Sequence, residues 1–93
     1  MTQKTTAPFR AQVRSTKELG ALVRALRKSK GLTLAKVSGI TNLGMRFLSE
    51  FERGKETAEI GKVLLLLTLF GLEVSINTRG YYNNFPVLED AES

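Results

Sequence analysis

The clearest pattern of apolar positions lies in the first half of the chain, between residues 15 and 31. Its apolar positions follow the i, i+3, i+4, i+7 spacing of one helix face: Leu19, Leu22, Val23 and Leu26. Ser15 and Glu18 have the S-x-x-E spacing of a capping box, in which hydroxyl and carboxylate each accept from a backbone amide. Gly31 supplies the left-handed residue that commonly follows a helix. The pattern predicts an amphipathic helix that begins at Ser15 and ends before Gly31.

Two shorter helices are predicted next, with a tight turn between them. Thr33 is a suitable N-cap for a helix that reaches about Gly39. Residues 40–43 form the turn, where Asn42 tolerates positive φ better than other non-glycine residues. A third helix is expected over Gly44–Glu52. Its apolar positions are Phe47, Leu48 and Phe51.

A fourth helix is predicted over Ala58–Phe70, with Thr57 as its cap and Gly71 after its end. Its expected core stripe is Ile60, Val63, Leu64, Leu67 and Phe70. Three further leucines fall partly outside that stripe: Leu65, Leu66 and Leu69. This is more apolar surface than an isolated domain of this size needs, which favours a dimer.

Residues 72–78 alternate apolar with polar side chains, the period of a half-buried strand. A single strand leaves its backbone groups unpaired. Its partner is either the same strand of a second subunit or a short strand over Phe9–Val13 of the same chain. The candidates for a dimer interface are Leu65, Leu69, Leu72, Val74 and Ile76.

The predicted architecture is therefore an all-α, four-helix domain with a C-terminal β-strand that pairs across a two-fold dimer. We expect an N-terminal arm (residues 1–14), a folded domain (15–78) and a C-terminal tail (79–93).

Composition argues against an enzyme. The 93 residues contain no cysteine and no histidine, so a thiolate metal site and a histidine general base are both excluded. No cofactor or metal is expected. The longest apolar run, Val63–Leu67, is far shorter than the roughly 20 residues of a membrane span, and no signal peptide precedes it. The expected location is the cytoplasm.

Charge is distributed unevenly along the chain. Residues 1–55 hold twelve Lys/Arg and three Asp/Glu, whereas residues 56–93 hold two and six, which gives net charges of +9 and −4. A basic half of this kind favours a polyanionic partner such as nucleic acid.

The two short helices and their turn have the layout of a helix-turn-helix, with Ser38 as the small residue where the helices approach closely. Four stretches resemble the Cro/C1-type (Xre) helix-turn-helix family: Gly31–Thr33, Asn42–Lys55, Val63–Leu64 and Phe70–Val74. Within it they are most similar to the HipB-type antitoxins of HipA–HipB toxin–antitoxin systems. The resemblance implies a λ-repressor-like homodimer that binds pseudo-palindromic double-stranded operator DNA, represses its own operon and binds a HipA-like kinase toxin.

The resemblance also implies roles for individual residues. The base contacts it implies are Met45, Arg46, Ser49 and Glu50. Arg46 is the best candidate for bidentate pairing with guanine. Glu50 either accepts from cytosine N4 or orients Arg46 from four positions away. The implied phosphate contacts are Gly44, Lys36, Arg53 and Lys55. Arg10 and Arg14 are candidates for a basic arm that reaches a groove.

Three further features bear on this interpretation. Arg27 and Glu52 match a structural salt bridge of the phage repressors in the family, so we assign both to the fold. Leu34 stands where the family usually has a glutamine that contacts phosphate, and Gly39 weakens the second helix. Two alternatives remain open: a stand-alone Xre-type repressor without a toxin, and a protein-interaction module with vestigial DNA binding.

Overall fold

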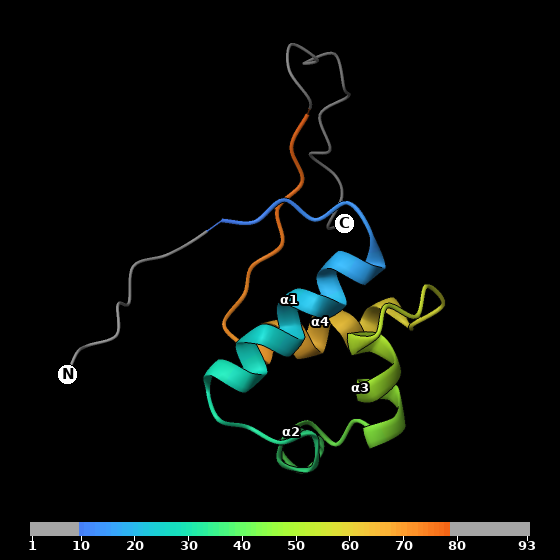
Figure 1. Cartoon of the computed structure of the whole chain (residues 1–93). Helices are drawn as coiled ribbons and strands as arrows, with labels where there is room; N and C mark the ends of the chain where they lie inside the picture. Colours follow the sequence, from blue (N-terminus) through green and yellow to red (C-terminus); the bar gives the residue numbers. More distant parts are fainter. Residues whose placement is uncertain (1–9, 79–93) are drawn as a thin grey trace, which may run out of the picture.

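The computed structural model describes residues 10–78, which contain four α-helices and no β-strand (Figure 1). The helices are α1 (Thr16–Ser29), α2 (Leu34–Thr41), α3 (Met45–Glu52) and α4 (Ile60–Leu69). In Figure 1, α2 and α3 meet at a steep angle at the edge of the domain, and α1 crosses in front of α4. The predicted four-helix fold is confirmed for this part of the chain.

Helix α1 begins where its sequence signals place it. The Ser15 hydroxyl accepts from the Glu18 amide at 3.0 Å, and Gly31 follows the helix with a φ of 70°. The Glu18 carboxylate accepts from the amide of Arg14 at 2.6 Å, so it fixes the chain that enters the helix. Val23 lies on the face of α1 that packs against the other helices and is buried in the core. Both ends of α1 are therefore determined by local contacts.

One hydrophobic cluster holds the four helices together. Its buried members are Val23, Val37, Leu43, Leu48, Phe51, Val63, Leu66, Leu67 and Phe70. Phe51 and Leu48 are each only 1% exposed and anchor α3 against the other helices. Burying a side chain of this size contributes about 1.5–3 kcal/mol. The inner face of α3 is thus fixed by packing, and its outer face is exposed to solvent.

Helix α4 differs from the prediction in its start and in its phase. It begins at Ile60 with Glu59 as N-cap and without a side-chain capping bond, so the prediction of Thr57 as the cap is wrong. Leu66 is buried, whereas Ile60 and Leu64 are 68% and 44% exposed, so the predicted core stripe is wrong at these positions. An unbroken apolar run has no periodicity of its own, and contact with the other helices decides which side is buried. None of the helices in residues 10–78 has the length and hydropathy needed to cross a membrane.

Residues 72–78 lead away from the helices in Figure 1 and pair with no strand in the described chain. Leu72 is half-buried against the core, whereas Val74 and Ile76 are 56% and 95% exposed. Residues 10–13 form no strand either, so the described part of the alternative intrachain partner is not paired with this segment. Phe9 and the predicted tail, residues 79–93, lie outside the described residues. The described residues therefore leave the side chains of Val74 and Ile76 uncovered.

Candidate nucleic-acid interface

The turn between α2 and α3 is held by side-chain hydrogen bonds. Asn42 follows α2 with a φ of 65°, as its position in the turn predicted. The Ser38 hydroxyl donates to the Leu43 carbonyl at 2.7 Å, and the Thr41 hydroxyl accepts from the Leu43 amide at 3.1 Å. Helix α2 runs to Thr41, two residues beyond the predicted end, and these bonds fix the direction in which the chain leaves the turn.

The first turn of α3 projects from the domain. The Arg46 side chain is 90% exposed and Met45 is 49% exposed. Gly44 is the N-cap of α3 and offers no side-chain capping bond. The first amides of a helix lack intrahelical acceptors, so this end of α3 presents N–H groups and a partial positive charge to solvent. An exposed guanidinium and unpaired backbone N–H groups are thus found at the same end of α3.

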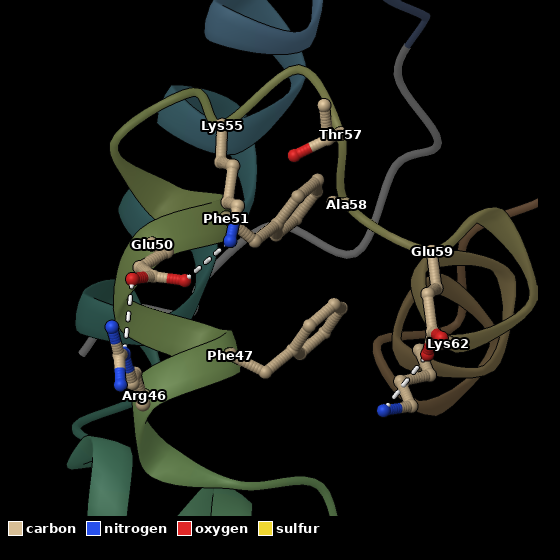
Figure 2. A pocket seen from close by; sticks show the side chains of 9 residues that line it. All are labelled: Arg46, Phe47, Glu50, Phe51, Lys55, Thr57, Ala58, Glu59 and Lys62. Atoms are coloured by element: carbon tan, nitrogen blue, oxygen red, sulfur yellow. Dashed lines mark hydrogen bonds and ion pairs between the residues drawn. The ribbon is translucent and has the colours of Figure 1, made fainter.

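Glu50 joins two cations on the outer side of α3. One carboxylate oxygen accepts from Arg46 Nε at 3.2 Å, and the other accepts from Lys55 Nζ at 3.0 Å (Figure 2). The hydrogen bond from Lys55, and then that from Arg46, hold the pKa of Glu50 below its ordinary value. Glu50 therefore stays ionised at neutral pH, as both ion pairs require.

The sequence pattern did not predict the contact between Glu50 and Lys55. Lys55 lies beyond the end of α3, five positions after Glu50, so helical periodicity does not pair them. The backbone provides the reason, because the Lys55 amide donates to the Glu50 carbonyl at 3.1 Å and turns the chain back along the helix. The signal in the sequence is Gly54, whose φ of 96° permits this return.

The other predicted contact residues on α2 and α3 are also at the surface. Arg53 is exposed and donates to the Ser49 hydroxyl at 2.7 Å. Lys36 is exposed in the first turn of α2, where its amide donates to the hydroxyl of the N-cap Thr33. Ser49 and Glu50 each accept a hydrogen bond from a cationic side chain of this chain. The side chain of Met45 is apolar.

A hollow of about 360 Å³ opens between α3 and the start of α4. Figure 2 shows Phe47 and Phe51 pointing from α3 toward it, and their rings stack at 6.2 Å between centroids. On the α4 side, Lys62 lies 5.5 Å from the centre of the Phe47 ring and bonds Glu59 at 2.8 Å. The Lys62 bond lowers the pKa of Glu59. The charged side chains that line the hollow are thus paired with one another, and its aromatic wall is formed by two residues of α3.

Leu34 and Gly39 have distinct surroundings in α2. Leu34 packs half-buried against the core, so its side chain is not available to a phosphate. A side chain added at Gly39 would meet no atom within 4 Å. Leu34, in place of the family's glutamine, changes the surface that α2 offers. Gly39 only weakens the helix.

Arg27 and Glu52 form a buried ion pair between α1 and the end of α3. Arg27 donates to the two carboxylate oxygens of Glu52 at 2.7 and 2.9 Å, and its third donor binds the Leu32 carbonyl at 2.8 Å. The residues are 8% and 9% exposed. The bond to Glu52 raises the pKa of Arg27 although burial opposes this. The pair belongs to the interior and fixes the end of α3 on α1.

The remaining predicted site residues lie away from this surface along the chain. Arg10 and Arg14 precede α1 and are exposed, and Arg14 donates to the Gln12 side chain at 2.8 Å. On α4, Leu65 and Leu69 are 51% and 41% exposed. The structure thus exposes charged side chains on and beside α3 and apolar side chains on α4 and in the segment after it.

The comparisons with known proteins agree with this fold. A family model described as a helix-turn-helix domain matches residues 18–75. A Sinorhizobium fredii protein described as an uncharacterized HTH-type transcriptional regulator, y4mF, is 38% identical over 69 residues, which span 74% of this chain and 91% of that protein.

Solved structures of similar fold include chains of a HipB–O4 20mer complex and of a HipA–HipB–O2–O3 complex. Each has a TM-score of 0.68 and 14% sequence identity, and each match covers 75% of this chain and 99% of that chain. At this identity the likeness concerns the fold. The family match and the Sinorhizobium fredii relative show that the chain belongs to the helix-turn-helix domain family, and the structural likeness shows that its fold is HipB-like, as the resemblance to the Xre family implied.

Proposed function

We propose that this protein is a dimeric, sequence-specific DNA-binding transcriptional repressor. The observation that carries the proposal is the first turn of α3, which projects Arg46 into solvent beyond a turn fixed by hydrogen bonds. A helix held in this way fits the major groove, where side chains of its N-terminal turn reach base edges. Residues 15–78 would form the DNA-binding and dimerisation domain, between an arm (1–14) and a tail (79–93).

The proposed contacts fall into two groups. The base-reading side chains are Met45, Arg46, Ser49 and Glu50, with Glu50 acting through Arg46. The phosphate contacts are Lys36, Arg53, Lys55 and the backbone amide at Gly44. Phosphate contacts fix the register on the duplex, whereas base contacts select the sequence. The exposure of Arg46 and the position of Lys55 beside it support this division.

Arg46→Ala is expected to reduce sequence preference, because one bidentate contact with guanine contributes about 1–3 kcal/mol of discrimination. The test begins with in vitro selection from random duplexes, followed by binding of the selected duplex and a scrambled duplex across a salt series. Lys55→Ala is the matched control. It should weaken binding to both duplexes alike and reduce the salt slope by about one unit. An equal loss on both duplexes for Arg46→Ala would remove Arg46 from base recognition.

The proposed dimer brings two copies of α3 to successive major grooves, about 34–36 Å apart. Its support is the apolar surface that the single chain leaves uncovered: Leu65, Leu69, Val74 and Ile76, beside the half-buried Leu72. Residues 72–78 would pair with the same segment of the second subunit, and residues 73–78 would so gain backbone partners that they lack within residues 10–78.

Leu69→Lys and Ile76→Lys are each expected to shift the protein to a monomer, because a charge would be buried in the interface. Light scattering after gel filtration measures the mass over a range of concentrations. Ile40→Lys is the control, since Ile40 is 53% exposed but lies on α2. A dimer that persists in both Leu69→Lys and Ile76→Lys would disprove this interface.

We further propose that a HipA-like kinase toxin is the protein partner, which would make this chain an antitoxin that regulates its own operon. The support is the shared fold with a chain of the HipA–HipB–O2–O3 complex. Affinity purification of the tagged protein from its host at high salt tests the proposal, because salt removes partners bridged by DNA. A stoichiometric kinase-like protein is expected. Recovery of the protein alone would leave a stand-alone repressor, and failure to bind DNA would favour a protein-interaction module.

A further inference from the structure

Glu50 binds the two cations to which the proposed function gives different tasks. Arg46 is the base-reading side chain and Lys55 is a phosphate contact, and each donates to a different oxygen of the same carboxylate. The other acidic residue of α3, Glu52, is buried in the pair with Arg27. Glu50 is therefore the acidic side chain of α3 that lies beside the proposed DNA surface.

The geometry at Arg46 leaves its reading groups free. Glu50 accepts from Nε, so the two terminal nitrogens of the guanidinium remain available. Those two nitrogens can donate to O6 and N7 of one guanine. A cognate base contact is thus compatible with the Arg46–Glu50 bond, which fixes the plane of the guanidinium.

A phosphate contact at Lys55 is different, because Lys55 already has an anionic partner at 3.0 Å. A DNA phosphate must displace the Glu50 carboxylate or approach it, and the two negative charges repel. From α4, Glu59 and Lys62 line the same hollow but pair with each other at 2.8 Å. They do not neutralise Glu50.

We propose that Glu50 is a specificity-determining residue, which acts as an internal anion that competes with DNA phosphate for Lys55 while it orients Arg46. The proposal rests on the proposed function and concerns the same surface. Binding to arbitrary DNA is weakened, since the competition is not offset there by base contacts. On a cognate site, the oriented Arg46 contributes the base contact that offsets the repulsion.

Glu50→Gln tests the proposal, since it keeps the shape of the side chain and removes its charge. We expect about fivefold tighter binding to a scrambled 20-base-pair duplex at low salt, and a salt slope steeper by about one unit. The selected duplex should gain less, so the ratio of the two affinities falls. Glu59→Gln is the matched control, because it also removes one carboxylate beside the hollow but leaves Arg46 and Lys55 paired with Glu50. It should change binding less than twofold.

A double-mutant cycle identifies Lys55 as the partner through which Glu50 acts. In a Lys55→Ala background, Glu50→Gln should lose most of its gain on scrambled DNA. A gain that persists in full would overturn the competition for Lys55. A changed base preference at one position, without a gain on scrambled DNA, would instead make Glu50 a direct base contact and overturn the proposal.

The test separates this inference from the proposed function. If selection yields a preferred sequence but Glu50→Gln and Glu59→Gln behave alike, only the role of Glu50 is overturned. If selection yields no preferred sequence and Glu50→Gln still gains affinity, the competition stands and sequence-specific repression falls. Absence of DNA binding by the wild-type protein and by Glu50→Gln would overturn both. Thermal unfolding of each variant confirms that the folded protein is being compared.

Discussion

Glu52→Ala is expected to destabilise the domain by about 3–5 kcal/mol, because it leaves the buried Arg27 guanidinium without its anionic partner. Arg27 loses two charge-assisted bonds, of 2.7 and 2.9 Å, and keeps only the one to the Leu32 carbonyl. Both members of the pair are less than a tenth exposed, so water does not replace the lost bonds. The loss is a large part of the roughly 5–15 kcal/mol that stabilises a small protein.

Urea unfolding at one fixed protein concentration measures this loss, since dimerisation makes stability depend on concentration. Glu59→Ala is the control, because it breaks an ion pair of similar length, 2.8 Å, between side chains that are at least half exposed. Such exposed pairs contribute little to stability, because solvent screens them. The double variant Arg27→Met, Glu52→Leu should recover much of the loss, since the unpaired charge is gone. Equal midpoints for Glu52→Ala and the parent would show that the pair does not hold α3 on α1.

Sequence alone predicted the features that local chemistry determines. The Ser15 cap, the positive φ of Gly31 and Asn42, and the Thr33 cap of α2 each depend on residues within a few positions. The outer face of α3 was predictable for the same reason, since helical periodicity separates it from the buried Leu48 and Phe51.

Features that depend on contacts distant in the chain were predicted less well. The phase of α4 is decided by the other helices, so Leu66 rather than Leu64 faces the core. The Glu50–Lys55 contact needs the chain to turn back after α3, and no periodicity records that turn. A strand over residues 72–78 needs a partner segment, and none pairs with it in residues 10–78.

Gly20 must be a glycine for a reason that the sequence pattern does not show. A glycine inside an amphipathic helix normally marks only lower helix propensity. In the structure, Gly20 is buried where α1 crosses the end of α3, and a Cβ there would clash with the Phe51 carbonyl oxygen and lie 3.0 Å from that of Glu52. These are backbone atoms of a buried segment, and the Phe51 carbonyl also accepts from the Gly54 amide at 2.9 Å. Neither helix can move aside without disturbing the core.

Gly20→Ala is therefore expected to destabilise the domain by about 1–3 kcal/mol or more, although alanine favours the helix by about 1 kcal/mol. Gly39→Ala is the matched control, because Gly39 also lies inside a helix and an added methyl group would meet no atom within 4 Å. It should stabilise the protein by up to about 1 kcal/mol. Urea midpoints of the two variants should thus move in opposite directions. If both rose, helix propensity would outweigh packing, and the close approach of α1 to α3 would not be a constraint on this fold.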